Sequence, residues 1–312
     1  MDFLNLFSRM PAAVAQGLLW GLMALGVYIS YKILDVADLS VDGTFALGGA
    51  VTVMSIIAGV PAWAALLLAI LAGIAAGLCT GLLHTKLGIP AILSGILTQF
   101  ALYSIDLRIM GMKANQTASL KNYGMFFENG RGFLVSSRYV NPAILTGVVL
   151  AAAVVGVLYW YFGTEQGSAV RATGANPQMS SAQGININAM KVLGLALSNG
   201  IVALSGGLVT QFQGTADVNM GRGAIVIGLA AIVIGEVLCD ALFGEGCNFA
   251  IRLGFVVVGG VIYYLVMTVI LWLRLDPNDL KLFTALIVAA FLSVPQWKAR
   301  RASAFRKTGG KQ

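Results

Sequence analysis

The chain has 312 residues, of which 58% are hydrophobic and only 11% are charged. Soluble domains carry charge on about 25% of their residues, so this scarcity of charge excludes a surface that mostly faces water. The formal net charge is +7, but the basic residues crowd the C-terminus, where they predict a solvated tail and no nucleic-acid partner. These numbers predict one membrane domain over residues 1–312, embedded in the lipid bilayer, with no separate soluble domain.

Nine stretches are predicted to cross the bilayer, for which a helix needs about 20 apolar residues. We therefore predict an all-α polytopic membrane protein with about nine transmembrane helices. The second stretch is short and rich in glycine, and the third carries Gly73, Gly77 and Gly81 at a spacing that lets helices approach closely. The predicted spans cover residues 14–31, 44–57, 62–83, 89–109, 143–162, 192–212, 224–242, 249–273 and 280–294.

The orientation of the chain follows from its basic C-terminal tail, residues 297–312, which the positive-inside rule assigns to the cytoplasm. Counting the spans back from this tail predicts a cytoplasmic hairpin over residues 164–190. The same count predicts an extracytoplasmic segment over residues 111–141 and an N-terminus on the outer side. The segment 111–141 is itself basic, against the rule, although the rule binds long loops less strictly.

Two short segments resemble one another across the chain. Residues 37–43, ADLSVDG, are similar to residues 216–222, ADVNMGR, which begin 179 positions later. Five predicted spans lie between the equivalent points, and an odd number inverts the second copy relative to the membrane. We interpret the pair as an inverted-topology repeat, as in many transporters. The alternative is chance similarity between two short turns.

Several predicted spans carry polar side chains, which are costly in hydrocarbon and tend to face a bundle interior or a water-filled cavity. One interpretation is a substrate path. The other is hydrogen bonding between helices that holds the bundle together, and both stay open. The candidate path residues are Asp42, Thr98, Gln99, Tyr103, Asn199 and Gln211.

Three further charged residues lie near span ends. We expect Asp106 and Arg108 to pair with each other at the outer interface, and Glu236 to pair with Arg171 or Lys191 near the inner one. The chain contains no Walker motif, no HExxH and no serine nucleophile elbow. We therefore expect no catalytic residue, no metal site and no cofactor on this chain, and a source of energy outside it.

The longest polar run inside the chain is residues 171–186, RATGANPQMSSAQGIN. The dipeptide Asn176-Pro177 is a helix-start signal. Met179, Ala182 and Ile185 recur at a three-residue spacing and predict one apolar stripe on a short helix. A helix of this kind can lie in a groove of a soluble partner.

This run also carries a family resemblance. Residues 165–186 resemble the segment of ABC importer permeases of the branched-chain amino acid and ribose type that docks on the ATPase. Residues 37–50 resemble the D-L-S-V-G-S segment of the sugar members, with Asp42 and Gly43 where those members carry Gly and Ser. Residues 93–111 look closest to a subgroup in which Asp106 is usually Asn, and some members of it work with binding proteins for aromatic amino acids. The positions implied to couple to the ATPase are Arg171, Ala172, Thr173, Gly174, Asn176, Ala182, Gly184 and Ile185.

The resemblance covers the chain from Gly17 to about Val294. It implies a permease subunit, not an enzyme, of an ATP-driven importer for a small polar solute such as an amino acid. It also implies an ABC ATPase dimer, an extracytoplasmic binding protein and a second permease copy, in a homodimer or a heterodimer, in a bacterial plasma membrane. The alternatives are a gradient-driven secondary transporter, for which Glu236 is the candidate buried acid, and a membrane scaffold without transport.

Overall fold

The computed structural model describes residues 3–118, 124–125, 132–244 and 247–272, with a few isolated positions beyond them. Seven helices in these parts are long and apolar enough to cross a membrane, and an eighth is apolar but shorter. The predicted all-α polytopic architecture is therefore confirmed. The ninth predicted span, 280–294, lies largely outside the described residues, and the basic tail, 297–312, lies entirely outside them.

Most predicted spans coincide with helices to within a few residues, and the polar hairpin resolves into two short helices. Helix α1 (Phe3–Tyr28) continues directly into the π-helix η1 (Ile29–Ile33). The other helices, in chain order, are α2 (Val41–Ile57), α3 (Ala62–Thr85), α4 (Ala91–Ile109), α7 (Val140–Gly163), α8 (Glu165–Ala175), α9 (Pro177–Ala182), α10 (Ile187–Gln213), α11 (Ala224–Phe243) and α12 (Phe249–Trp272).

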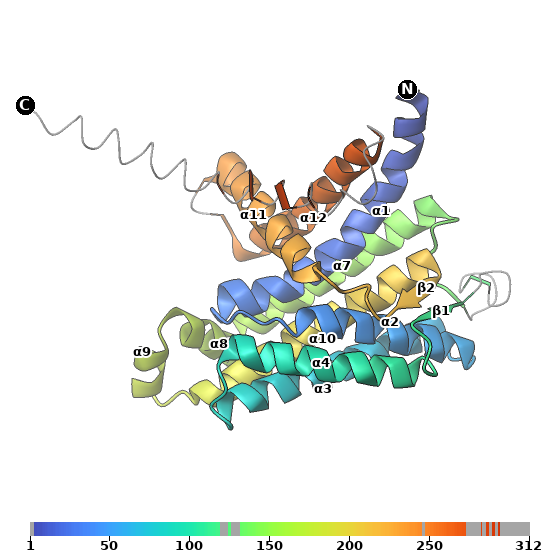
Figure 1. The fold of residues 1–312 in the computed structure, drawn as a ribbon. Helices are drawn as coiled ribbons and strands as arrows, with labels where there is room; N and C mark the ends of the chain where they lie inside the picture. The colour runs from blue at the N-terminus through green and yellow to red at the C-terminus, as the bar shows by residue number, and fades with distance from the viewer. Residues whose placement is uncertain are drawn as a thin grey trace, which may run out of the picture.

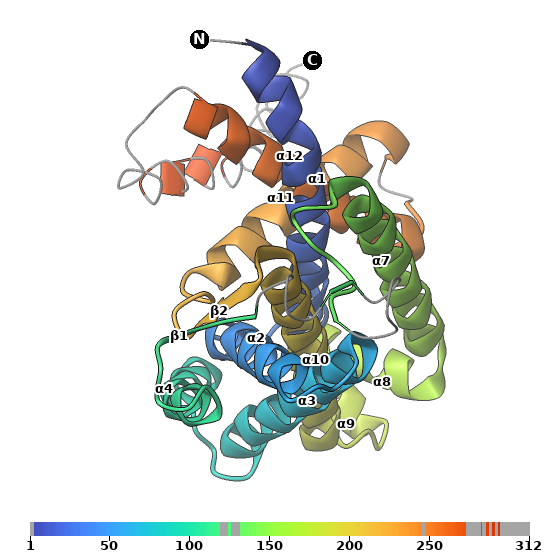
Figure 2. The same cartoon turned by 90° about the vertical axis from the view of Figure 1, so that its right-hand side faces the viewer.

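Helix α10 runs through the middle of the bundle, with α1, α2 and α3 packed around it (Figures 1 and 2). Glycine makes this packing close. A methyl group at Gly48 would overlap the carbonyl oxygen of Ala203, and one at Gly77 would overlap that of Leu195. The predicted close approach at Gly73, Gly77 and Gly81 is thus confirmed, because all three face the backbone or side chains of α10.

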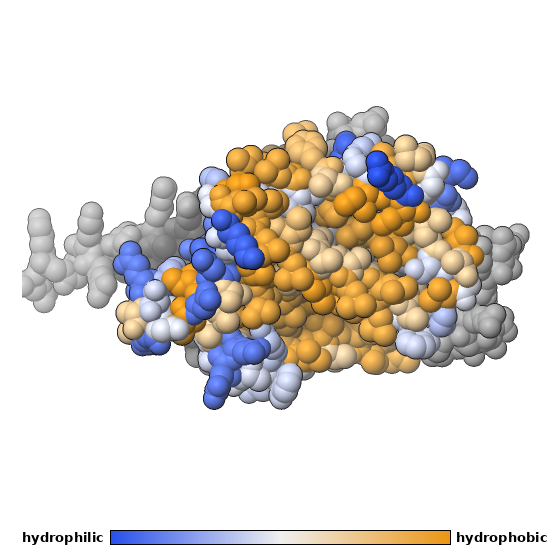
Figure 3. Space-filling view, turned by 90° about the horizontal axis from the view of Figure 1, so that it is seen from below, coloured by the Kyte–Doolittle hydropathy of each residue, from blue (hydrophilic) through white to orange (hydrophobic). Residues whose placement is uncertain are grey.

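The outer surface of α3 is apolar and faces away from the bundle. Leu67, Leu71 and Leu82 are 52%, 62% and 41% exposed. The face seen from below is a broad hydrophobic band, with hydrophilic residues gathered toward its ends (Figure 3). A band of this kind is the surface expected of helices in contact with lipid tails.

The packing supports the inverted repeat. Helix α1 packs on α12 as α10 packs on α3, and α1 meets α11 as α10 meets α2. Exchanging α1 with α10, α2 with α11 and α3 with α12 turns each of these helix contacts into its counterpart in the other half. The two similar turns also share their local geometry. Oδ1 of Asp38 accepts from the Ser40 amide at 2.9 Å, and Oδ1 of Asp217 accepts from the Asn219 amide at 2.6 Å.

The two halves of the repeat meet at Asp42. Its carboxylate accepts from the amides of Gly223 at 2.9 Å and Ile225 at 3.0 Å, which belong to the first turn of α11. The N-cap residue of α11 is Gly223, which has no side chain to cap the helix itself. The residue equivalent to Asp42 in the second half, Gly221, packs so tightly that a methyl group there would overlap the Asp42 carbonyl oxygen. A helix of one half thus caps a helix of the other.

A small two-stranded sheet closes the end of the bundle opposite α8 and α9 (Figure 1). Strand β1 (Asn115–Thr117) pairs antiparallel with β2 (Thr215–Asp217). The amide of Leu134 donates to the Gln211 side chain at 2.9 Å, and the amide of Ser137 donates to the carbonyl of Phe212 at 2.9 Å. The described parts of the segment 111–141 are therefore fastened to the end of α10.

Replacing Asp42 with Ala is expected to lower the stability of the bundle by about 1–2 kcal/mol, the usual contribution of a helix N-cap. The reason is that two amides at the start of α11 lose their acceptor. The measurement is the midpoint of thermal unfolding of the detergent-purified protein. Asp35→Asn, in the preceding loop, is the control, because Asp35 is exposed and its left-handed backbone suits Asn. Equal midpoints for both variants would contradict the capping role.

Candidate functional site

The polar hairpin is built from two capped helices. The Thr164 side chain accepts from the amide of Gly167 and starts α8, and the Asn176 side chain accepts from the amide of Met179 at 3.0 Å and starts α9. Pro177 occupies the first turn of α9, where its missing N–H costs nothing. Asn186 then caps α10 through the amide of Ala189 at 3.2 Å. The sequence signal at Asn176-Pro177 therefore marks a true helix start.

Helix α8 rests directly on the end of the first span. A methyl group at Gly174 would overlap the carbonyl oxygen of Ile33 in η1, so only glycine allows this contact without movement. Thr173 is buried and donates to the carbonyl of Ala169 at 2.8 Å. The guanidinium of Arg171 lies 5.5 Å from the centre of the Phe249 ring, a cation–π contact that ties α8 to the start of α12.

Helix α9 projects away from the bundle (Figures 1 and 2). Met179 is 60% exposed, and Ala182 and Gly184 are exposed as well. Gly184 has a φ of +83° with open space around its Cα, so its role is the turn itself. The predicted stripe needs one correction. Helix α9 ends at Ala182, so Ile185 lies in the turn beyond it and only Met179 and Ala182 lie on the helix.

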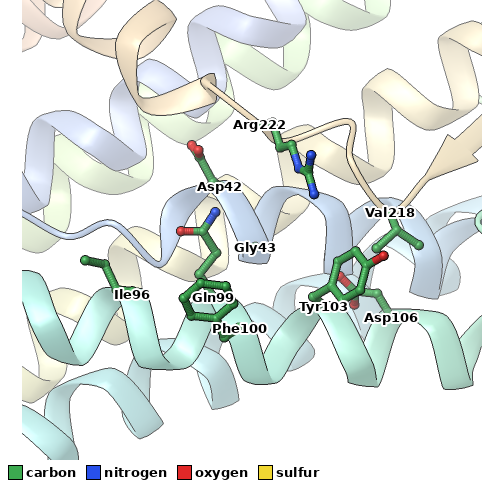
Figure 4. A pocket seen from close by; sticks show the side chains of 9 residues that line it. All are labelled: Asp42, Gly43, Ile96, Gln99, Phe100, Tyr103, Asp106, Val218 and Arg222. Atoms are coloured by element: carbon green, nitrogen blue, oxygen red, sulfur yellow. The ribbon is translucent and has the colours of Figure 1, made fainter.

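Three of the six predicted path residues meet around one pocket. This pocket has a volume of about 430 Å³ and lies between α2, α4 and the turn that leads into α11 (Figure 4). Within it, the carboxylate of Asp42 is already engaged by the amides of α11, whereas Gln99 and Tyr103 project from α4. The lining residues are Asp42, Gly43, Ile96, Gln99, Phe100, Tyr103, Asp106, Val218 and Arg222.

The other three predicted path residues lie elsewhere and are hydrogen-bonded within the protein. Thr98 is buried and accepts from the hydroxyl of Thr80 at 2.9 Å. Gln211 is buried at the end of α10, where its oxygen accepts from the Leu134 amide. Asn199 is buried in the middle of α10. Their contacts are of the kind that holds helices and segments together.

The buried partner of Asn199 is Asp38, which we did not predict as a site residue. Nδ2 of Asn199 donates to Oδ2 of Asp38 at 2.7 Å, and the Ser40 hydroxyl donates to Oδ1 of Asp38 at 2.6 Å. Asp38 is 2% exposed. The sequence did hold a signal, because Asp38 lies in the repeated turn, but only the fold brings that turn against α10.

Two predicted ion pairs are wrong. Asp106 does not pair with Arg108, because Asp106 is fully buried on one side of α4 and Arg108 is exposed on another. Glu236 pairs neither with Arg171 nor with Lys191. Instead, Nζ of Lys32 lies 3.2 Å from both of its carboxylate oxygens. Among the described residues no group of three or more His, Cys, Asp or Glu side chains is arranged to hold a metal ion.

Comparison with known families decides the class of protein. Residues 10–293 match the family described as the permease component of branched-chain amino acid transport systems. The chain belongs to this family. It is therefore a multi-pass permease subunit of an ABC importer for amino acids, as the polar hairpin suggested, and not a gradient-driven transporter or a scaffold.

Individual relatives match nearly the whole length of the chain. A tyrosine transport system permease protein of Clostridioides difficile (strain R20291) is 40% identical over 290 residues, which cover 92% of this chain and 91% of that one. An uncharacterized protein of Rickettsia prowazekii (strain Madrid E) is 33% identical and covers 90% of this chain and 95% of its own. The solved structure of PsaBC from Streptococcus pneumoniae in complex with Fab shares the fold, with a TM-score of 0.51, 12% identity and coverage of 93% and 94%.

Replacing Asn199 with Ala is expected to destabilise the permease by about 2–4 kcal/mol, because a buried carboxylate loses a donor that nothing replaces. Thermal unfolding of the purified permease measures the change. Asn219→Ala provides the comparison, since Asn219 is exposed in the equivalent turn of the second half. If the two substitutions lower the midpoint equally, the buried Asp38–Asn199 hydrogen bond does not make the predicted contribution to stability.

Proposed function

We propose that this permease imports aromatic amino acids across a bacterial plasma membrane, driven by ATP hydrolysis on a separate pair of ABC ATPase subunits. The observation that carries the proposal is the exposed helical hairpin α8–α9 on a chain of this permease family. Every residue of α9 except Ser180 is exposed, so the helix offers Met179 and Ala182 to a partner. The substrate class rests on the relative named as a tyrosine transport permease.

In this proposal residues 164–190 are the cytoplasmic coupling hairpin. When ATP draws the two ATPases together, they move α9, and α8 moves with it. Because Gly174 touches the carbonyl of Ile33 directly, displacement of α8 acts on η1 and the end of α1. The loop that follows η1 carries Asp38, which is hydrogen-bonded to the centre of α10. The hairpin is thereby linked to the middle of the bundle through a direct backbone contact and a buried hydrogen bond.

The opposite end of the bundle would receive the substrate. The described parts of the segment 111–141 are fastened to strand β2 and the end of α10 there, and they offer a surface for an extracytoplasmic binding protein. This assignment fits the basic tail 297–312 in the cytoplasm, which the positive-inside rule favours.

A second permease copy is expected against α4. This helix is the least apolar of the described spans, and Tyr103, Ser104 and Arg108 on it are exposed. Polar groups of this kind are costly against lipid, so they favour a face covered by another subunit or by the water of the path. We infer a homodimer, with a heterodimer as the outcome of the test if a different permease chain co-purifies.

The direct test is transport by the purified assembly in proteoliposomes loaded with ATP. We expect tyrosine uptake that requires ATP and the binding protein, and a tagged permease that retains the ATPase in mild detergent. Replacing residues 164–190 with a flexible linker should remove both the ATPase and the uptake. Uptake that runs on an ion gradient without ATP would contradict the proposal.

The exposed face of α9 gives a sharper prediction. Met179→Asp adds a charge where an apolar contact with the ATPase is expected, so co-purification of the ATPase should fall about tenfold or more. Ser181→Asp is the matched control, because position 181 is also exposed but lies on the far side of the same helix. Equal retention of the ATPase by both variants would exclude the Met179 face as the docking surface.

A substitution at the contact between α8 and η1 is expected to impair transport without releasing the ATPase. Gly174→Val is expected to push α8 off the Ile33 carbonyl, so ATP-driven uptake should fall several-fold while the ATPase stays bound through α9. The comparison is Gly163→Ala at the end of α7, where an added methyl group has open space. Unchanged uptake in Gly174→Val would refute transmission through this contact.

A further inference from the structure

The pocket beside α4 contains a buried acid that has no hydrogen-bond partner among the described residues. The α4 residues around it recur every three or four positions, so they form one face of the helix. They are Ile96, Gln99, Phe100, Tyr103 and Asp106. This face runs from the middle of the span to its outer end, away from α8 and α9 (Figure 1). The volume of about 430 Å³ lies in the range of small-molecule sites.

Asp106 is fully buried, and neither of its carboxylate oxygens has a hydrogen-bond partner in the described structure. A buried carboxylate in this state is costly, and the cost falls when a ligand supplies a donor. The other acid of the pocket does not share this property. Asp42 is satisfied by the amides of α11. Asp106 is therefore the acid of the pocket that lacks a partner among the described residues.

A basic group stands across the same pocket. Arg222 extends its guanidinium from the turn before α11 toward the side of the pocket that holds Tyr103 and Asp106 (Figure 4). It is exposed and forms none of the ion pairs found among the described residues. A guanidinium presents paired N–H donors that match a carboxylate. The pocket thus offers one unpaired acid and one unpaired base.

Aromatic rings complete the lining. Phe100 is 72% exposed and Tyr103 is 43% exposed, and both project from α4 at the open side of the pocket. Aromatic side chains contribute apolar area with a preferred ring geometry, so they suit a ligand that carries a ring of its own.

We propose that this pocket is a binding site within the permease for an aromatic amino acid. The ligand's ammonium group binds Asp106, its carboxylate binds Arg222, and its ring packs against Phe100 and Tyr103. This inference rests on the proposed function, which supplies the substrate class. It adds that the permease itself recognises the zwitterion at the outer end of α4, so that selectivity does not reside in a binding protein alone.

The test is equilibrium binding of labelled L-tyrosine to the full-length permease in lipid nanodiscs, without partners. Tyramine, which lacks the carboxylate, and 3-(4-hydroxyphenyl)propionate, which lacks the ammonium group, serve as competitors. We expect tyrosine to bind about tenfold more tightly than either, since each end makes a charge-assisted hydrogen bond.

Two variants divide the pocket into its two ends. Asp106→Asn should abolish the preference for tyrosine over the propionate and keep the preference over tyramine. Arg222→Gln should do the reverse. Lys86→Gln is the control, because Lys86 is an exposed basic residue outside the pocket, and it should change neither preference. Gel filtration and thermal unfolding identify any variant that misfolds, and the opposite responses of the two variants to the two competitors cannot arise from misfolding.

Two results would overturn the proposal. One is the absence of tyrosine binding to the wild-type permease at millimolar concentration. The other is that both variants keep the wild-type preferences, which would show that Asp106 and Arg222 do not bind the charged groups of the ligand. Neither result depends on ATP. ATP-dependent uptake without this binding would preserve the proposed function and reject the site, whereas selective binding with ATP-independent uptake would do the opposite.

Discussion

The bond between Asp42 and the first turn of α11 is the constraint on which the arrangement of the two halves depends. The exposed amides at a helix N-terminus carry partial positive charge, and the N-cap residue of α11, Gly223, has no side chain to satisfy them. Asp42 supplies both acceptors from the other half of the repeat. Because Arg222 lies between Gly221 and Gly223, which both contact Asp42, the same bond also positions the basic group of the pocket.

The close helix packing explains how a chain with so few charges builds specific contacts. Glycine at the crossings brings backbones near enough for single hydroxyls to bond across them. Ser198 and Ser205 on α10 donate to the carbonyls of Gly26 and Leu19 on α1, at 2.8 and 2.7 Å. Apolar packing alone discriminates poorly between helix partners in lipid, so these bonds and the small residues that permit them define the pairing.

Close contacts of the same kind connect the hairpin to the middle of the molecule. At one end α8 rests on η1 with no side chain between them, and nearer the middle of the bundle Asp42 joins α2 to α11. The buried Asp38–Asn199 bond lies in the chain segment that links η1 to α2. In the proposed cycle, a push on the hairpin reaches the pocket along this segment, because each step is a backbone contact or a buried hydrogen bond and packed interiors transmit displacement.

The sequence by itself determined the class of fold, the position of nearly every helix, the capped hairpin and the family. Apolar length, helix-start residues and the RATGAN segment are local properties, so they can be read from neighbouring positions. It also indicated Gln99 and Tyr103, which share one face of one helix.

Only the tertiary structure decided which polar residues are partners. The pairing of Asp38 with Asn199 and of Lys32 with Glu236 depends on how distant helices pack, and so does the lack of a partner for Asp106 among the described residues. Hydropathy measures the cost of burying such groups, but only the packed bundle decides which of them find a partner.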